Sequence, residues 1–401
     1  MAWEVKKLGE IAEIKGGKRV PKGYSLEFVQ TNHPYIRVTD FNDDGTINLT
    51  DLRYVNDLIF DQIKNYTISK EDLYISIAGT IGKTGIVPNE LDGANLTENA
   101  CKLVFLKNID KRFIYYFTKT DDFLVQAGLN TRTTTMAKLA LTRLATIQIP
   151  IPSLNEQKHI VAILDEAFER IAKAKENAEK NLDNAKEVFE SYLQNVFEKK
   201  GEGWEEKMLG EVCDTGAGGT PLKSHKEYYE NGTIPWLRSG EVDKKDIISP
   251  EMLITPIGLK NSSARLFPKN TVLIAMYGAT AGQVGILRFE SSTNQAVCGI
   301  LPNDKFIPEF LYYKFNAGKA DLIKQAVGGA QPNISQIKIK NTFVPVLSIS
   351  MQKSIVSKLD NLSQETKKLS EIYEKKLADL EELKKSILQK AFNGELIEVS
   401  A

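Results

Sequence analysis

Cysteine and histidine are both scarce in this 401-residue sequence, with three residues of each. The cysteines stand far apart, without any C-x-x-C spacing, at Cys101, Cys213 and Cys298. The histidines fall in three separate segments, at His33, His159 and His225. Widely spaced cysteines in odd number argue against a disulfide framework, and isolated histidines do not make a metal-ligand set. We therefore expect neither a metal site nor a histidine-dependent catalytic site.

Long apolar segments are missing as well, since no run of about 18 apolar residues exists that could cross a bilayer. Residues 1–7 contain no apolar core and no small-residue cleavage site, so we expect no secretory signal, no membrane partner and a cytoplasmic protein. The hydrophobic content of 42% and charged content of 26% are typical of a globular protein. The length favours two domains with connecting elements over one.

Neither sign of charge is in excess. Lys and Arg together number 52, as do Asp and Glu, and the balance holds by segment, at 19 against 18 in residues 1–150 and 16 against 15 in residues 201–350. A DNA-binding protein of this composition must cluster its cations on one face, or partners must supply much of the non-specific affinity.

The strongest feature present is an internal repeat at a spacing of about 200 residues. The matching segments of the first and second halves are 3–11 with 204–212, 16–21 with 218–221, 34–40 with 235–241, 73–86 with 272–286, 97–100 with 293–296, 113–116 with 310–313 and 149–152 with 344–347. The order of these segments is the same in both halves, so the sequence predicts two domains of one kind.

Each half divides by composition into a globular part and a helix. Residues 1–150 and 204–347 contain short β-branched runs bounded by turn signals such as Asn-Asp-Asp-Gly at 42–45. We expect these parts to be mostly β, with short helices around Phe113–Val125 and Pro308–Gln325.

Glycine and proline are absent from residues 153–200 and 351–393, which are dense in Glu, Lys, Leu and Ala. At about 1.5 Å per residue, each segment predicts a helix on the order of 65 Å long. Asn-Gly at 393–394 gives the second helix a C-cap signal. Because a globular domain lies between the two helices, we expect them to pair antiparallel, with the two domains at opposite ends.

An apolar stripe runs along each predicted helix and should serve helix pairing or the docking of partners. Its main residues are Leu164, Ile171, Leu182 and Phe189 in the first helix and Leu362, Leu369, Leu380, Leu383 and Ile387 in the second. Thr366, Lys376 and Lys390 are the weak positions of the second stripe. The predicted class is therefore α+β, with two mostly-β domains separated by two long antiparallel coiled-coil helices. The predicted boundaries are a first domain 1–152, a first helix 153–200, a second domain 201–350, a second helix 351–394 and a tail 395–401.

The segment Gly-Lys-Thr at 82–84 resembles the end of a phosphate-binding P-loop. That motif requires a glycine at position 77, which is Ile77. The repeat also places Gln283 where Lys83 stands, so a nucleotide site would not survive duplication. We interpret the segment as a tight β-turn and assign no catalytic residue in the chain.

Taken in order, these features resemble the specificity subunits of type I restriction-modification enzymes. The resemblance rests on the doubled W-x-x-x-x-L-G-E openings, Gly-Gly-Thr-Pro at 218–221, the proline strands at 149–152 and 344–347, and Glu-Gln-Lys at 156–158. The first half departs from it with Gly-Gly-Lys-Arg at 16–19.

The resemblance implies two target-recognition domains, each reading one half of a split site in double-stranded DNA, with the helices as a spacer. It also implies that methyltransferase subunits, two of them, dock on the helices and that motor-nuclease subunits join the complex. No cofactor is expected in this chain, because S-adenosylmethionine, ATP and Mg²⁺ belong to those partners.

The candidate DNA contacts are polar residues in exposed loops, because arginine can make paired hydrogen bonds to guanine, and asparagine or glutamine to adenine. They are Lys18, Arg19, Arg37, Lys83, Thr131, Arg132, Thr133, Thr220, Lys223, Arg238, Gln283 and Gln331. For Arg37 and Arg238, a structural pair with Asp40 or Glu241 is equally favoured. For segments 131–133 and 328–331, any single residue fits a plain surface loop better.

The aromatic pairs Tyr115-Tyr116 and Tyr312-Tyr313 fit a hydrophobic core better than a base-stacking surface. The main alternative for the whole chain is a coiled-coil scaffold whose domains bind peptide or glycan. A second alternative is the recognition part of a related phage-defence or single-chain restriction system. A nuclease or NTPase is the weakest interpretation.

Overall fold

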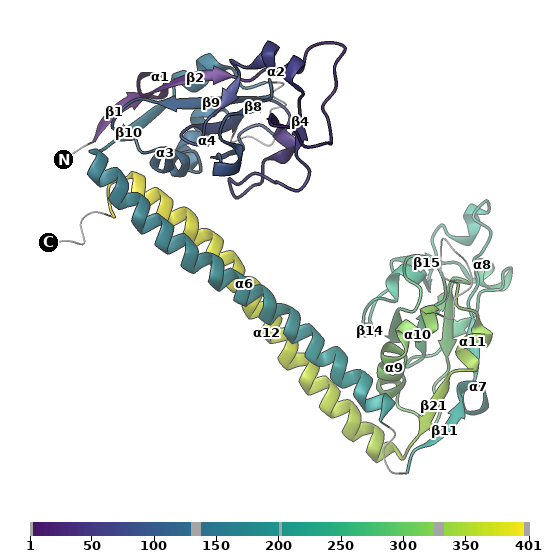
Figure 1. Ribbon diagram of the computed structural model, residues 1–401. Coiled ribbons are helices and arrows are strands. Elements are labelled where there is room, and N and C mark those ends of the chain that lie inside the picture. Colours follow the sequence, from purple (N-terminus) through teal and green to yellow (C-terminus); the bar gives the residue numbers. More distant parts are fainter. Residues whose placement is uncertain (1–2, 130–137, 200–202, 325–332, 397–401) are drawn as a thin grey trace. The chain divides into compact units, whose positions relative to one another are not determined.

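The computed structural model describes residues 3–129, 138–199, 203–324 and 333–396. The chain divides into unit 1, which comprises Met1–Ala178 and Lys376–Ala401, and unit 2, which comprises Glu179–Lys375. Each unit contains one domain of strands and short helices together with part of each long helix, α6 (Leu154–Glu198) and α12 (Ile349–Phe392) (Figure 1). The predicted α+β class is confirmed.

In the described part of unit 1, the domain has two four-stranded sheets and one strand pair. The first sheet has the order β2 (Ala12–Gly16), β9 (Ala100–Phe105), β6 (Leu73–Ser76) and β7 (Thr84–Ile86). The second has the order β4 (Arg53–Tyr54), β3 (Pro34–Ile36), β8 (Ala94–Leu96) and β5 (Thr67–Ile68). Strand β1 (Glu4–Lys7) pairs antiparallel with β10 (Gln148–Ile151).

The helices of this domain are α1 (Leu8–Ile11), α2 (Asp57–Ile63), α3 (Lys111–Phe117), α4 (Asp121–Ala127) and α5 (Leu141–Ala145). The short helices predicted around Phe113–Val125 are α3 and α4. The first helix has Thr118 as its C-cap, and Thr120 caps the second, because its hydroxyl accepts a hydrogen bond from the amide of Phe123 at 3.2 Å.

The domain of unit 2 repeats this plan. Its larger sheet has the order β12 (Thr215–Ala217), β20 (Val297–Ile300), β17 (Val272–Ala275), β18 (Val284–Leu287) and β14 (Asp246–Ile247). Its second sheet has the order β15 (Met252–Ile254), β13 (Ile234–Leu237), β19 (Ser291–Thr293) and β16 (Leu266–Phe267). Strand β11 (Glu205–Met208) pairs with β21 (Phe343–Val346).

The short helices of unit 2 follow the same order as those of unit 1. They are α7 (Leu209–Val212), α8 (Pro256–Lys260), α9 (Pro308–Ala317), α10 (Lys319–Lys324) and α11 (Gln336–Lys340). The short helices predicted around Pro308–Gln325 are α9 and α10. Strand β14 is an addition to the larger sheet that its described counterpart in unit 1 lacks.

Backbone hydrogen bonds fix how the two halves correspond. The amide of Lys18 donates to the carbonyl of Leu96 at 2.8 Å, and the amide of Gly219 donates to the carbonyl of Thr293 at 2.9 Å. Leu96 and Thr293 each occupy the same place in a parallel strand pair, β3 with β8 and β13 with β19. Lys18 therefore corresponds to Gly219. The sequence alignment of the glycine loops and of the segments at 97 and 293 is wrong by one residue, because matching letters do not define which carbonyl the loop contacts.

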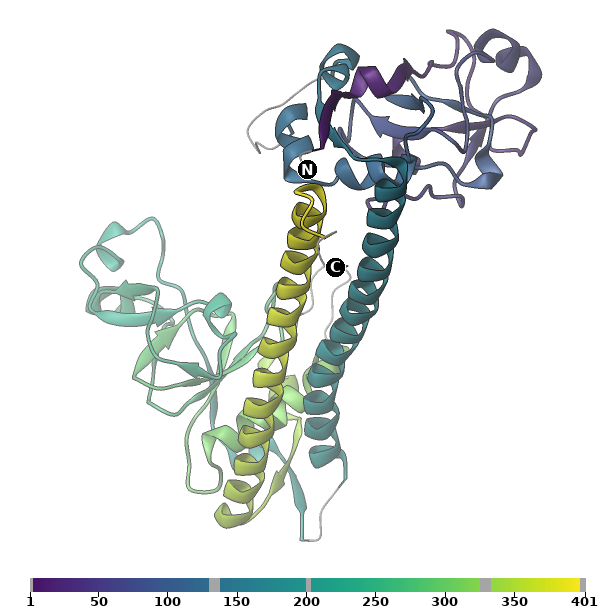
Figure 2. The same cartoon turned by 90° about the vertical axis from the view of Figure 1, so that its left-hand side faces the viewer.

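Both long helices contribute to the core of each domain. In unit 1, Leu164 of α6 and Leu388 of α12 lie in one buried cluster with domain residues, and the Phe392 ring is 4.9 Å from the Phe113 ring. In unit 2, Leu193 of α6 and Leu359 of α12 are buried among domain residues in the same way. Within each unit the two helices lie side by side in opposite directions (Figure 2).

Two polar contacts, present in both halves, fix each domain to the start of its long helix. Gln157 and Gln352 are fully buried. The amide oxygen of Gln157 accepts from the Asp110 amide at 2.8 Å, and that of Gln352 accepts from the Ile307 amide at 3.0 Å. The side-chain nitrogen of Gln157 donates to the carbonyls of Asn108 and Pro152. The side-chain nitrogen of Gln352 donates to the corresponding carbonyls of Lys305 and Leu347.

The second contact joins a domain tyrosine to an aspartate of the helix. The Tyr116 hydroxyl donates to Asp165 at 2.5 Å, and the Tyr313 hydroxyl donates to Asp360. Burial, followed by the contact with the aspartate, raises the pKa of both tyrosines well above the usual value. Tyr116 and Tyr313 are buried, so the prediction that the aromatic pairs belong to the core is confirmed for these two rings.

Most of the predicted stripe is buried or partly buried. Leu164 and Ile171 are buried, and the partly buried members are Leu182, Phe189, Leu362, Leu380 and Ile387. Leu369 and Leu383 are different, because their side chains are 43% and 47% exposed. Thr366, a weak position of the same predicted stripe, is buried, and its hydroxyl donates to the Leu362 carbonyl at 2.9 Å. A satisfied hydroxyl can be buried at little cost, so this polar position still belongs to the buried face.

We predict that Gln157→Ala lowers the free energy of unfolding of unit 1 by about 3 kcal/mol, because it leaves a buried amide and carbonyls without partners. Gln352→Ala should have a similar effect on unit 2. Urea unfolding of the intact chain, followed by circular dichroism, measures both. Lys158→Ala changes an exposed neighbour and is the control. A Gln157→Ala variant as stable as the control would contradict the prediction.

Candidate nucleic-acid interface

Two pockets occupy corresponding places in the two domains. The unit-1 pocket, of about 590 Å³, is lined by residues from the segments 19–26, 35–39 and 97–99. The unit-2 pocket, of about 610 Å³, is lined by corresponding segments, including Thr220, Lys223, Lys226, Trp236, Arg238 and Gln295. Cations, aromatic rings and hydrogen-bonding side chains meet in both pockets. These are the groups with which proteins contact phosphates and base edges.

The glycine loop forms one wall of each pocket, and Gly17 and Gly218 within it have no room for a Cβ atom. A Cβ atom on Gly17 would lie 2.1 Å from the carbonyl oxygen of Thr97, and one on Gly218 would lie 2.1 Å from the Thr293 hydroxyl. An aromatic side chain then holds the loop. The Tyr35 hydroxyl donates to the Lys18 carbonyl at 2.8 Å, and the Trp236 indole donates to the corresponding carbonyl of Gly219 at 2.9 Å.

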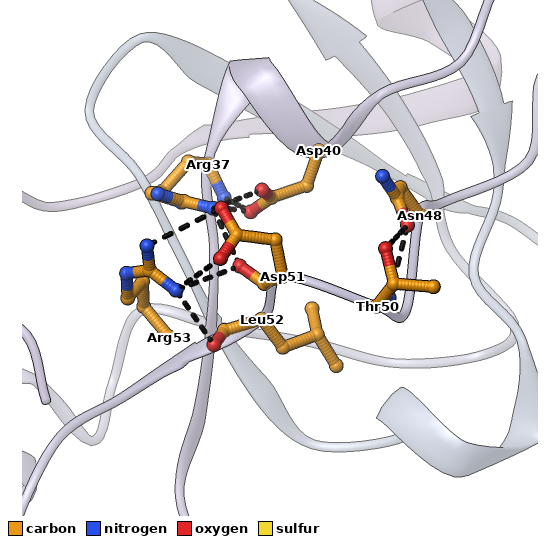
Figure 3. A network of polar contacts seen from close by, with 7 residues as sticks. All are labelled: Arg37, Asp40, Asn48, Thr50, Asp51, Leu52 and Arg53. Carbon is orange, nitrogen blue, oxygen red and sulfur yellow. Dashed lines mark hydrogen bonds and ion pairs between the residues drawn. The ribbon is translucent and has the colours of Figure 1, made fainter. Parts of the chain in front are cut away.

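Arg37 lies in the unit-1 pocket within a network of carboxylates (Figure 3). Its Nη2 donates to Asp40 Oδ1 at 2.5 Å, and its backbone amide donates to Asp40 Oδ2 at 2.7 Å. Nη2 also donates to the Asp51 carbonyl at 2.7 Å. The hydrogen bond with Asp40 raises the pKa of Arg37, against the opposing effect of partial burial. The Asp40 side chain is only 3% exposed, so the structural role that we weighed for Arg37 has direct support.

A second arginine extends this network to the surface. Arg53 Nη1 donates to Asp51 Oδ1 at 2.5 Å (Figure 3), and its guanidinium lies over the exposed Phe28 ring, 3.8 Å from the ring centre. Arg53 is therefore held on both sides in β4, the strand that pairs with β3.

Arg238 has the corresponding position in unit 2 and is held less tightly. Its backbone amide donates to Glu241 at 2.8 Å, but its Nε is 4.0 Å from the same carboxylate. Its Nη2 donates to Glu251, and half of its side chain is exposed. Arg238 is thus the more available of the two arginines.

A side-chain pair bridges the glycine loop and the segment after the parallel strand in each pocket. In unit 1, Arg19 Nε donates to Glu98 Oε1 at 2.6 Å. In unit 2, the Thr220 hydroxyl donates to Gln295 Oε1. One pair is charged and the other is neutral, although both occupy the same position in the fold.

The remaining described candidates lie outside the two pockets. Lys83 Nζ donates to the Phe41 carbonyl at 3.0 Å and lies 2.8 Å from an Asp43 oxygen, which indicates a structural role in the turn. Gln283 follows β17 in the corresponding turn and is half-buried. Lys18 is exposed beside Arg19, with its ammonium 5.5 Å from the centre of the Tyr66 ring.

Four predicted contacts lie outside the described residues: Thr131, Arg132, Thr133 and Gln331. Sequence reasoning missed Glu98, Gln295, Lys226 and Trp236, which line the pockets. The first two belong to the matching repeat segments 97–100 and 293–296. A glutamate or glutamine close to a threonine does not by itself predict a site. Its role becomes visible only when the fold brings it to the glycine loop.

Other kinds of site are not indicated in the described parts of the chain. No three or more His, Cys, Asp and Glu side chains there are arranged to hold a metal ion. Cys101 and Cys298 are buried, and burial raises the pKa of each thiol to about 12, so both stay protonated at neutral pH. No described helix has the length and apolar character of a membrane span.

Comparison with known proteins identifies the family. The model of the type I restriction modification DNA specificity domain matches the chain twice, over residues 2–181 and 201–381. The chain belongs to this type I specificity family. The two matches correspond to the two halves of the repeat, so each unit contains the domain portion of one match.

Relatives with type I specificity names include the EcoR124I/EcoR124II specificity subunit of Escherichia coli, 29% identical over 56% of this chain and 57% of the relative. The MjaIX specificity subunit of Methanocaldococcus jannaschii is 32% identical over 43% of this chain and 41% of its own length. The aligned region thus spans about half the length of these two relatives. The putative MjaX specificity subunit of the same organism is 25% identical over 98% of this chain and 93% of the relative.

Solved structures support the fold of this type I specificity protein. An HsdS subunit from Thermoanaerobacter tengcongensis matches with a TM-score of 0.67 at 19% identity, covering 98% of this chain and 97% of that chain. A chain from a structure described as the complex assembly and conformational transition of the type I R-M system matches with a TM-score of 0.79 at 20% identity, covering 98% of both chains. The scaffold interpretation gains no support from any of these relatives.

We predict that Arg37→Ala lowers the free energy of unfolding of unit 1 by about 3 kcal/mol, because it leaves the buried Asp40 carboxylate without its cation. Arg238→Ala should cost no more than about 1 kcal/mol, because its pair with Glu251 is exposed and its Nε is 4.0 Å from Glu241, which keeps its hydrogen bond from the Arg238 backbone amide. Urea unfolding of the intact chain gives both values. Adding Asp40→Asn to Arg37→Ala should restore part of the loss. Equal losses for the two single variants would contradict the assigned roles.

Proposed function

We propose that this chain is the sequence-recognition subunit of a type I restriction-modification complex and has no catalytic site of its own. Residues 1–152 and 201–350 act as target-recognition domains, each reading one half of a bipartite site in double-stranded DNA. The observation that carries this proposal is the pair of corresponding pockets, built on one backbone frame inside two matches to the specificity family.

The long helices set the distance between the two half-sites. Residues 153–200 and 351–394 act as the spacer, and a rise of about 3.4 Å per base pair converts their length into a required separation of the half-sites. This role agrees with the continuous 45-residue α6 and 44-residue α12.

The partners are methyltransferase subunits, two per chain, which dock on the helices, and motor-nuclease subunits. Exposed apolar residues on the helices fit such docking: Val188, Leu369, Ile372 and Leu383. S-adenosylmethionine, ATP and Mg²⁺ act in these partners. The complex works in the cytoplasm, where the DNA of a prokaryotic cell lies.

The balanced charge of the chain fits DNA binding in which this chain and its partners contribute different parts of the affinity. Because Lys and Arg equal Asp and Glu at 52 each, this chain offers little excess charge for neutralising phosphates. The partners therefore supply much of the non-specific affinity, while the pockets supply the sequence preference.

We predict that adenine methylation appears at one split motif in cells that express this chain together with its neighbouring methyltransferase. Sequencing that detects methylated adenine measures it directly. Cells with the methyltransferase alone are the control and should lack methylation at that motif. If methylation is the same without this chain, while the methyltransferase is active, the proposed function is excluded and the scaffold interpretation takes its place.

A further inference from the structure

The two pockets share a backbone frame but differ in the side-chain pair that closes it. Arg19 and Thr220 each follow the residue whose amide donates to the end of the parallel strand, Lys18 in unit 1 and Gly219 in unit 2. They therefore correspond to each other. Glu98 and Gln295 each stand two residues after the accepting carbonyl and correspond likewise. The same position in the two domains thus carries a charged side-chain pair in unit 1 and a neutral pair in unit 2.

Arg19 is arranged to present its guanidinium to a ligand. Its Nε is engaged by Glu98 at 2.6 Å, while its side chain is 76% exposed. Among the described residues, the two terminal amino groups of Arg19 have no hydrogen-bond partner. Two parallel donors of this kind match the O6 and N7 acceptors of guanine in the major groove.

Glu98 acts on Arg19 and is itself shielded. Its side chain is 25% exposed, and it also accepts a hydrogen bond from the Thr97 hydroxyl at 3.0 Å. Partial burial alone would raise its pKa, but the hydrogen bond from Arg19, with those from the backbone and Thr97, lowers it. Glu98 therefore stays ionised at neutral pH and holds the guanidinium in one orientation.

The pair in unit 2 cannot make the same contact. Thr220 carries no charge, and its hydroxyl occupies the Gln295 carbonyl oxygen. The amide nitrogen of Gln295, the residue that corresponds to Glu98, adds a neutral donor to this pair. A neutral hydroxyl-amide pair offers neither the charge nor the two parallel donors that favour guanine.

We propose that Arg19, positioned by Glu98, specifies a guanine in the half-site read by unit 1, and that Thr220 and Gln295 specify a different base at the corresponding place in unit 2. This inference rests on the proposed function and adds the residues that make its two half-sites different. Arg19 contacts the base, whereas Glu98 is a positioning residue.

The test measures binding of the complete complex, formed with the methyltransferase, to duplexes in which each base of the mapped motif is varied in turn. Arg19→Lys keeps the positive charge but removes the two parallel N–H donors of the guanidinium. We expect it to reduce the preference for guanine at one position of one half-site by roughly 10- to 100-fold. The preferences in the other half-site should not change, so that half-site is an internal control for folding and assembly.

Glu98 variants separate positioning from general structure. Glu98→Ala should weaken the same guanine preference, whereas Glu98→Gln, which retains an acceptor for Arg19 Nε, should restore most of it. Gln295→Ala should alter one position of the other half-site only. Lys22→Ala changes an exposed lysine of the unit-1 pocket, and we expect it to lower affinity for all sequences alike.

Three results would overturn the inference while the proposed function stands. They are a unit-1 half-site without guanine, an Arg19→Lys variant with unchanged base preferences, and a Glu98→Gln variant as relaxed as Glu98→Ala. A wild-type complex that binds no split motif would overturn the proposed function, and the inference with it. The wild-type measurement therefore distinguishes the two failures.

Discussion

The packing of both long helices into the core of each domain is the contact on which the other features depend. Leu164 and Leu388 complete the core of unit 1, as Leu193 and Leu359 complete that of unit 2. Removing a helix end would expose apolar surface worth about 25 cal/mol per Å². The hydrophobic core of neither domain is therefore complete without the helices. Each pocket consequently has a fixed position relative to the helix segments of its own unit.

Polar contacts make that relation specific. An apolar interface alone tolerates small rotations, because the hydrophobic effect is not directional. A buried glutamine with three partners, Gln157 or Gln352, and a tyrosine bonded to a helix aspartate permit far fewer arrangements. Because both contacts occur in the two halves, each domain packs in the same way on the helix segments of its own unit. The side chains of the pockets can differ without changing this packing.

The repeat, the α+β class and the long helices could be predicted because each depends on local pattern: recurring letters, turn residues, and segments without glycine or proline. The site was harder to predict. Arg19 and Thr220 were found because they follow a glycine loop, but Glu98 and Gln295 were not, since each lies more than 70 residues from its partner. Burial along the helices was also hard to predict, because it depends on what covers each face: Leu369 is exposed, whereas Thr366 is buried with its hydroxyl bonded.

By itself, the sequence determined that the chain is a duplicated pair of domains with two long helices, because duplication and helix propensity are written in consecutive residues. Only the tertiary structure decided the register of the repeat, since a one-residue offset is visible in which carbonyl accepts from Lys18 and from Gly219. It also decided that Arg37 is held by Asp40 while Arg19 is presented to solvent. The physical reason is that the availability of a cation depends on burial and on the carboxylate beside it, and both are set by strands that meet only in the folded domain.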